Sequence, residues 1–495
     1  MNKMSAIVLV AVAGAAQAEE LPGPAPGDLT HDGVTLYGTI DIGASYDTHG
    51  EALNSYFGSG NNDVIFGAKN ANKSYFGLTP NNLSLTKIGL KGEEALSRDW
   101  IGLFKAETGI NPLSGQLGDA LRSMSQQNGL QLQAQKTGWG DSSRAGQFLN
   151  GPVYAGVSNR QFGTLTMGRQ FTFTSEITTN YDPAFASNAG LLGYAGPPAG
   201  GGDAEDRLLD TMIKYSEAYG PVHAAGLYSF GDTSGESKAY QVKIGGEYGH
   251  LSIDGVYSKV LGAIASAPLT TCGSAAVAAS SPVLACTTPS NLSLSQAAAL
   301  AKGGLTESDT LAATISDNTA FQMAVEYDMG EPKFFLGYEH MMYGNPSSPL
   351  SDTGGINAAG ACNLTESGCL GISKTIGGYP VLTNNSNFGR NKVIEILWTG
   401  VRYAFSARFE IAASYYRESQ NNYSAVVSQQ GCSSGYVSAA CSGSFNAATL
   451  VADYKFTKRF DLYCQFAWSD VAGGMHNGYL RNNNVAPQFG ARFSF

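Results

Sequence analysis

The last eleven residues of the chain, VAPQFGARFSF (485–495), alternate between two kinds of side chain. Apolar residues occupy one set of alternate positions: Val485, Pro487, Phe489, Ala491, Phe493 and Phe495. Small or polar residues occupy the other set: Ala486, Gln488, Gly490, Arg492 and Ser494. Because successive side chains of a β-strand point to opposite faces, this pattern predicts a strand with one apolar and one polar face.

The same alternation recurs along the chain, at 34–46, 321–327, 409–415 and 460–468. Two kinds of connection separate such segments. Tight turns are expected at 248–250, 329–332, 405–407 and 457–459. Long loops rich in Gly, Ser and Asn are expected near 47–81, 111–150, 171–206, 261–317, 344–390, 420–445 and 471–484. Counting strands between these connections predicts a transmembrane antiparallel β-barrel of sixteen strands, with short turns at one end and long loops at the other.

Composition supports an all-β membrane protein over a soluble one. Of 495 residues, 62 are Gly, 25 are Tyr and 23 are Phe, while only 14% are charged. A soluble β-sandwich also alternates, but a packed core would not tolerate the charged face that the predicted strands carry. After the N-terminal segment no run of eighteen apolar residues could form a membrane-spanning helix. The net charge of −10 leaves no basic stripe for nucleic acid.

The N-terminus has the features of a secretory signal peptide. Lys3 gives a positive start, residues 6–16 are apolar, and Ala16-Gln17-Ala18 is a small-x-small cleavage site. We therefore expect a signal peptide at 1–18, a short N-terminal segment at 19–32, and one barrel domain at 33–495. Loss of Lys3 would leave a mature net charge of about −11.

Four short motifs, in order along the mature chain, carry a family resemblance. They are VTLYG (34–38), KIGLKGEE (87–94), FGTLTMGRQ (162–170) and DRLLD (206–210). Together they resemble the trimeric, sixteen-stranded general porins of Gram-negative outer membranes, of the proteobacterial type. The terminal Phe495 fits the same family.

The resemblance implies an outer-membrane channel for passive diffusion of small hydrophilic solutes and ions. It implies a homotrimer of separate pores in outer-membrane lipid, inserted by the barrel-assembly machinery, for which Phe495 is the terminal residue. In each pore, loop three is expected to fold back into the lumen and narrow it. Acidic residues of that loop would then face basic residues of the wall, and their field would set a weak charge selectivity.

Transferred to this chain, loop three is roughly 171–206. The acidic residues assigned to the constriction are Glu107, Glu176, Asp182, Asp203, Glu205 and Asp206. The basic residues assigned to it are Lys87, Lys91, Lys105 and Arg207, because Lys87 and Lys91 share the strand face opposite Ile88 and Leu90, and Lys105 shares a face with Glu107.

One further arginine is expected on the outside of the barrel. Arg169 shares its face with Leu165 and Met167, and since an arginine facing lipid would be costly, a trimer contact is expected there. The sequence departs from the family at 150–154, where a wall arginine is usual and NGPVY is found. The resulting surplus of acidic residues predicts a mild cation preference.

Six of seven cysteines form local pairs within three predicted loops: Cys272 with Cys286, Cys362 with Cys369, and Cys432 with Cys441. Passage through the oxidising periplasm predicts three disulfides. Metal ligation is the alternative, but no histidine accompanies any pair. Cys464 lies on the apolar face of its strand and is expected to be an inert, lipid-facing thiol.

The sequence offers little support for classes of function other than a channel. The six histidines are scattered, with no nucleophile motif beside them, so neither an enzyme nor a cofactor or metal site is expected. A substrate-specific channel with a solute-binding lumen remains the alternative, since the long loops are rich in tyrosine. An adhesin or phage-receptor role for those loops would accompany the pore.

Overall fold

A computed structural model describes residues 21–50, 56, 73–126, 128, 146–187, 189–190, 208–231, 238–267, 311–349, 372–376, 379–386, 388–423, 440–476 and 480–495. The predicted signal peptide and its boundary with the mature chain therefore lie outside the described residues. So do Asp203, Glu205, Asp206, Arg207 and all the paired cysteines except Cys441.

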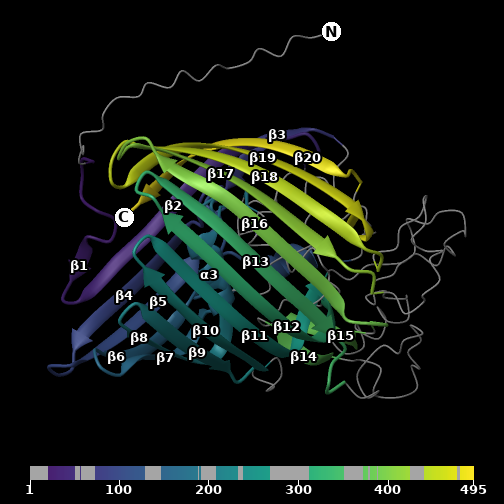
Figure 1. The fold of residues 1–495 in the computed structure, drawn as a ribbon, viewed down its shortest axis with the longest axis horizontal. Helices are drawn as coiled ribbons and strands as arrows, with labels where there is room; N and C mark the ends of the chain where they lie inside the picture. Colours follow the sequence, from purple (N-terminus) through teal and green to yellow (C-terminus); the bar gives the residue numbers. More distant parts are fainter. Residues whose placement is uncertain are drawn as a thin grey trace, which may run out of the picture.

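The chain forms a closed antiparallel β-barrel with sixteen wall strands, as the alternation predicted. Consecutive wall strands pair with one another, and the last closes on the first, where β2 (purple) lies beside β20 (yellow) in Figure 1. The wall strands are β2 (Val34–Asp47), β3 with β4 (Tyr75–Pro80, Lys87–Ala95), β5 (Trp100–Gly109), β6 (Val153–Asn159), β7 (Gly163–Phe171), β8 (Leu208–Tyr219), β9 (Val222–Ser229), β10 (Lys238–Tyr248), β11 (Leu251–Ala267), β12 (Leu311–Asp328), β13 (Pro332–Gly344), β16 (Lys392–Ala404), β17 (Phe409–Gln420), β18 (Gly443–Lys455), β19 (Phe460–Gly473) and β20 (Asn483–Ser494).

The other described elements are not strands of the wall. They are β1 (Leu29–His31), the hairpin β14 (Ile372–Ile376) and β15 (Tyr379–Asn385), the helices α2 (Ala120–Ser125) and α3 (Phe173–Tyr181), and the 3-10 turn η8 (Gly474–His476). Among the described residues, no helix combines the length and the apolar character that crossing a membrane requires.

The alternation seen in the sequence sorts side chains between the two faces of the wall. In β20, Phe489 and Phe493 are 56% and 43% exposed on the outside, whereas Gln488 and Ala486 are 2% and 0% exposed on the inside. An outward apolar face and an inward polar face are what a barrel in lipid requires. The terminal Phe495 exchanges two backbone hydrogen bonds of 3.0 Å with Gly38, which extends the closing ladder to the last residue.

Three of the predicted loops contain additional strand, and one of these strands is β3, which lies inside the loop expected at 47–81. β11 continues to Ala267 and β12 begins at Leu311, inside the loop expected at 261–317, and β14 and β15 lie inside the loop expected at 344–390. The ladder between β11 and β12 passes through a bulge between Val260 and Ala263, where Gly262 has φ +65°. A bulge of this kind interrupts the alternation without ending the strand pairing. The sequence pattern therefore predicted an end of β11 that lies before its true end at Ala267.

The second wall strand is interrupted, which the alternation did not indicate. Both β3 and β4 pair with β2, and residues 81–86 between them fold against the inside of the wall. Asp41 holds this interruption by accepting hydrogen bonds from the backbone N–H groups of Leu83 (3.1 Å) and Ser84 (2.7 Å). Leu83 is thereby buried, at 3% exposed.

Candidate functional site

The lumen contains a segment that crosses from one side of the wall to the other. α3 begins directly after β7, and the Thr172 side chain caps it by accepting a hydrogen bond from Ser175 N at 3.3 Å. The helix contacts β10, β11, β12 and β13, and it appears in the middle of the barrel in Figure 1. Phe173 and Ile177 are each 1% exposed against this wall. We call residues 172–190 the crossing segment.

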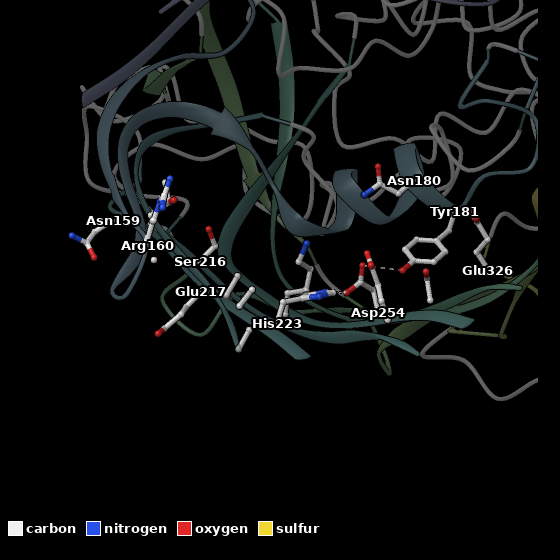
Figure 2. Close-up of a pocket in the computed structure, with 17 residues that line it drawn as sticks. Asn159, Arg160, Asn180, Tyr181, Ser216, Glu217, His223, Asp254 and Glu326 are labelled. Carbon is white, nitrogen blue, oxygen red and sulfur yellow. Dashed lines mark hydrogen bonds and ion pairs between the residues drawn. The ribbon is translucent and has the colours of Figure 1, made fainter. Parts of the chain in front are cut away.

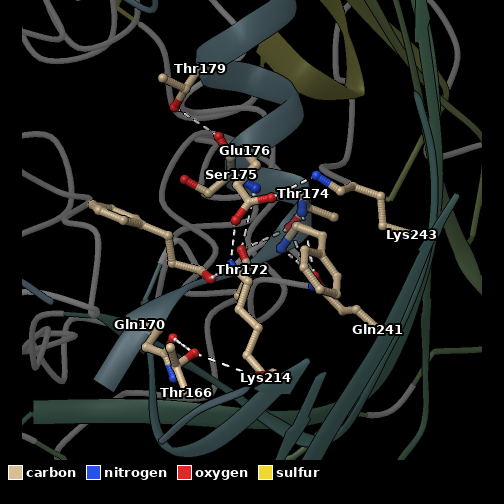
Figure 3. A network of polar contacts seen from close by, with 12 residues as sticks. Thr166, Gln170, Thr172, Thr174, Ser175, Glu176, Thr179, Lys214, Gln241 and Lys243 are labelled. Atoms are coloured by element: carbon tan, nitrogen blue, oxygen red, sulfur yellow. Dashed lines mark hydrogen bonds and ion pairs between the residues drawn. The ribbon is translucent and has the colours of Figure 1, made fainter. Parts of the chain in front are cut away.

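A charged cluster fixes the first turn of α3. The Glu176 carboxylate contacts two wall lysines, Lys214 of β8 and Lys243 of β10, the latter at 2.8 Å. Their ammonium groups lie 4.8 and 5.4 Å from the centre of the Phe173 ring. Figure 3 shows Lys243 reaching the helix from the neighbouring wall. Burial alone would raise the pKa of Glu176, but the two lysines hold it below its usual value, so the carboxylate stays ionised.

The far end of α3 is fixed to the opposite side of the wall. Trp398 Nε1 of β16 donates to Tyr181 O at 3.1 Å, and the Tyr416 hydroxyl of β17 donates to the Asp182 carboxylate. Thr449 Oγ1 of β18 donates to Ala189 O at 2.6 Å. Because β7 and β18 are the fifth and fourteenth wall strands, these contacts carry the crossing segment over the lumen.

An arginine holds the backbone at the corner after α3. Arg402 Nε donates to Pro183 O at 2.9 Å, and another guanidinium nitrogen donates to Asp182 O. The guanidinium lies 4.2 Å from the Phe185 ring centre and 4.7 Å from that of Phe335. The two cation–π contacts and the two hydrogen bonds to backbone carbonyl groups together hold this corner against the wall.

A basic patch lines the wall formed by β4 and β5. Glu107 Oε2 lies 3.4 Å from Lys87 Nζ and 3.7 Å from Lys105 Nζ, and it accepts the Tyr37 hydroxyl at 3.0 Å. Lys91 pairs with Lys105 across the two strands, and their ammonium groups lie 5.9 and 5.6 Å from the centre of the Tyr37 ring. Three lysines around one carboxylate leave an excess of positive charge on this part of the wall.

A glycine makes room for that arrangement. A Cβ added to Gly89 would lie 2.5 Å from the Tyr37 ring and its hydroxyl oxygen. The ring therefore lies directly across the backbone of β4, which brings its hydroxyl group to Glu107 on β5.

A cavity of about 630 Å³ lies beside the end of α3, near the short-turn end of the barrel. His223 Nε2 lies 2.5 Å from Asp254 Oδ1, and the Tyr181 hydroxyl donates to Asp254 Oδ2 at 3.1 Å. Figure 2 shows both side chains directed at Asp254. The rest of the charged lining consists of Arg160, Glu217, Lys243, Glu247 and Glu326. The cavity therefore offers groups of both signs to a polar solute.

The predicted constriction residues fall into three places. Lys87, Lys91, Lys105 and Glu107 lie together in the basic patch, as the shared strand faces indicated. Glu176 lies apart from them, paired with lysines that the sequence reasoning missed. Asp182 is only 1% exposed and bonded to Tyr416, so it anchors the crossing segment instead of presenting a charge to solutes. The other four predicted residues, at 203 and 205–207, lie outside the described part.

Two residues predicted for other roles have defined partners. Arg169 Nη1 lies 2.5 Å from Oδ1 of the outward-facing Asp210. Arg169 Nε donates to Gly151 O at 3.2 Å. Its role as a trimer contact stays a prediction. Cys441 is disulfide-bonded to a partner outside the described residues, and Cys464 is a free, exposed thiol.

The residues that sequence reasoning missed are Lys214, Lys243 and Arg402. The alternation of β8, in which Met212, Lys214 and Ser216 share a face, could have placed Lys214 in the lumen. No pattern in the sequence predicts that these cations contact the crossing segment, because the contacts depend on the path that this segment takes through the lumen. Within the described ranges, no group of three or more His, Cys, Asp or Glu residues is placed to hold a metal ion.

Known proteins resemble this chain in sequence and in fold. A family model described as Gram-negative porin matches residues 5–474. An outer membrane porin protein of Bordetella pertussis is 26% identical over 221 residues, which is 43% of either chain. The chain thus aligns with less than half the length of that relative.

Two solved structures show the same fold. An anion-selective porin from Comamonas acidovorans superposes with a TM-score of 0.53 and 15% identity, over 93% of this chain and 99% of that one. OmpT, an outer membrane protein of Vibrio cholerae, in its trimer form, gives a TM-score of 0.50 and 12% identity, over 93% and 99%.

The first prediction concerns Asp182, which lies in the crossing segment. Burial raises its pKa to about 6, although Tyr416 and neighbouring groups oppose the shift. Because this pKa lies above that of the unfolded chain, the group favours the folded state below about pH 4 and this contribution is lost as the pH rises through 6. Asp182→Asn should therefore remove a pH-dependent loss on the order of 2–3 kcal/mol between pH 4 and 7.

The measurement is urea unfolding in lipid vesicles at several pH values, comparing the variant with the wild type. The difference between the two free energies of unfolding should grow with pH in favour of the variant. A difference that stays constant from pH 4 to 7 would show that Asp182 has an ordinary pKa. Asp32→Asn, at an exposed position, is the matched control.

The second prediction concerns Glu176. Glu176→Gln would leave Lys214 and Lys243 without their counter-charge at the crossing segment. The reversal potential in a KCl gradient should therefore move toward anion preference, because two unneutralised cations would line the passage. Glu331→Gln, in the exposed turn between β12 and β13, should leave the potential unchanged. A shift toward cations, or none, would show that Glu176 does not face the permeating ions.

Proposed function

The chain belongs to the Gram-negative porin family, which places it in the outer membrane, and on that premise we propose that it forms a water-filled channel for passive diffusion of small hydrophilic solutes and ions. Porins are channels and not enzymes. The observation that carries the proposal is a closed wall whose inner face is polar. In the part of the chain that the structure describes, the crossing segment spans the lumen and has charged groups at its docking sites. Such a lumen holds water, and the crossing segment leaves only part of its cross-sectional area open.

The charges on the described wall bear on selectivity. Around the first turn of α3 and the basic patch, five lysines (Lys87, Lys91, Lys105, Lys214 and Lys243) accompany two glutamates (Glu107 and Glu176), and this part of the lumen favours anions. Beside the last turn of α3, Glu247, Asp254 and Glu326 add negative charge. The mild cation preference rests on Asp203, Glu205 and Asp206, outside the described residues, and stays a proposal. With charges of both signs at the passage, the net preference should be weak.

The test of the proposed function is single-channel recording of the purified protein in a planar bilayer. Conductance should rise in proportion to KCl concentration, since ions cross a water-filled passage without a saturating site. The reversal potential in a salt gradient should show only a weak preference. Folded barrels that conduct no current would contradict the proposal.

A substrate-specific channel is the second candidate, and the cavity beside α3 is the observation in its favour. A volume of about 630 Å³ lies within the range of small-molecule sites, and the lining carries Arg160 at one end and Asp254 and Glu326 at the other. Saturable block of the current by one class of dipolar solute would favour this candidate over general diffusion.

We also propose that three copies associate. Arg169 and Asp210 form an ion pair on the outside of the wall, where Asp210 is 58% exposed. Such a pair facing lipid would be costly, and a neighbouring copy would cover it. OmpT of Vibrio cholerae adopts a trimer form with the same fold. The terminal Phe495 remains the proposed signal for the barrel-assembly machinery.

Asp210→Ala tests the trimer. The variant should lower the temperature at which the oligomer dissociates in detergent, because Arg169 would lose its partner within the contact. Gel electrophoresis after stepwise heating measures this temperature. Asp99→Ala, in the turn between β4 and β5, should behave as wild type. An unchanged dissociation temperature for Asp210→Ala would remove this face from the trimer contact.

A further inference from the structure

A helix that follows one wall strand contacts a strand on the far side of the barrel. α2 follows β5 in the chain, yet Leu121 and Met124 pack in an apolar cluster with Leu311 and Ala313 of β12. These four side chains are between 0% and 3% exposed, and the partly buried Ile264 of β11 packs against them. β5 is the third wall strand and β12 is the tenth, so the two are nearly opposite.

The beginning of α2 is fixed at the end of β5. Gly118 N donates to Gly109 O, the last residue of β5, at 2.9 Å, and Asn150 Nδ2 donates to Gly118 O at 2.9 Å. Asp119 caps the helix by accepting Arg122 N at 2.9 Å. Arg122 in turn lies 4.2 Å from the ring centre of Tyr56. α2 therefore begins within a few ångströms of β5 and cannot drift across the opening as a free loop.

The width of the barrel and the length of α2 show how closely the two sides of the wall approach at this opening. Sixteen strands about 4.8 Å apart and tilted by about 40° enclose a cylinder on the order of 30 Å wide. A helix of six residues is only about 9 Å long. The helix spans only about a third of that width, so at this opening the end of β5 and the extended ends of β11 and β12 lie closer together than opposite sides of a circular wall would. The bulge between Val260 and Ala263 bends β11 at the start of this extension.

We propose that α2 and the extended ends of β11 and β12 form a bridge over the long-loop opening that limits the size of the solutes that enter. The proposal rests on the proposed channel function and adds a second restriction to it, separate from the crossing segment. The bridge is held by the apolar cluster around Leu121 and Met124, so its contacts select by size and contribute little to charge preference. Small uncharged sugars should pass beside it, and larger oligosaccharides should be retarded.

The test opens the bridge without touching the wall. Leu121→Gln combined with Met124→Gln places two polar side chains in the apolar cluster, and both positions lie outside the wall strands. Single-channel conductance should rise by about 1.5-fold or more, because a wider entrance carries more current. Liposome swelling with sugars of increasing size should show faster entry of the larger ones. The reversal potential should stay at its wild-type value, since no charge is changed.

Leu113→Gln is the matched control, because Leu113 lies between β5 and α2 but is 40% exposed and outside the cluster. A second variant tests the contact directly: Met124→Cys with Ala313→Cys, in a Cys464→Ser background, should form a disulfide in the folded barrel. A double glutamine variant that folds but keeps the wild-type conductance and sugar cut-off would overturn the proposal, as would absence of the cross-link. A wild-type protein that conducts no current would instead contradict the channel function itself.

Discussion

Pairing of every backbone hydrogen-bonding group is the requirement on which the rest of this structure depends. Hydrocarbon offers no water to an unpaired N–H or C=O group, so a sheet in lipid must have no free edge. The ladder between β2 and β20 meets that requirement, and Phe495 extends it to the last residue through its bonds with Gly38. Closure fixes which face of each strand points to lipid and which to the lumen. The outward rings of Phe489 and Phe493 and the inward amide of Gln488 are consequences of one geometric condition.

A closed wall that points polar groups inward creates a second problem, which the crossing segment solves. Buried charges are costly unless they are paired, and the lumen of this barrel brings many of them together. Glu176 forms ion pairs with both Lys214 and Lys243, while Arg402 donates hydrogen bonds to the backbone carbonyl groups of Asp182 and Pro183. The same contacts that satisfy the wall therefore hold the segment across the passage. Structure and permeation are linked here, because changing a docking residue changes both the position of the segment and the charge beside the ions.

The fold and part of the site followed from the sequence because both depend on a period of two. Alternation placed Lys87, Lys91, Lys105 and Glu107 on inward faces of adjacent strands, and strand pairing then brought them together. The partners of Glu176 did not follow, because they depend on the three-dimensional path of residues 172–190 and not on any repeating pattern. The same reason applies to Asp182, whose carboxylate is occupied by Tyr416. The extension of β11 to Ala267 was missed because the bulge at Gly262 breaks the alternation while the ladder continues.

The most direct test of the central claim is whether the crossing segment remains docked across the lumen while the channel conducts. Ala189 and Thr449 meet at its far end, so cysteines at both positions, in a Cys464→Ser background, report on the contact. The account predicts that the pair cross-links in the folded barrel and that single-channel conductance is the same before and after reduction. A folded barrel that fails to cross-link, or whose conductance changes when the cross-link is reduced, would show that the segment leaves the wall and that the docked geometry is not the conducting one.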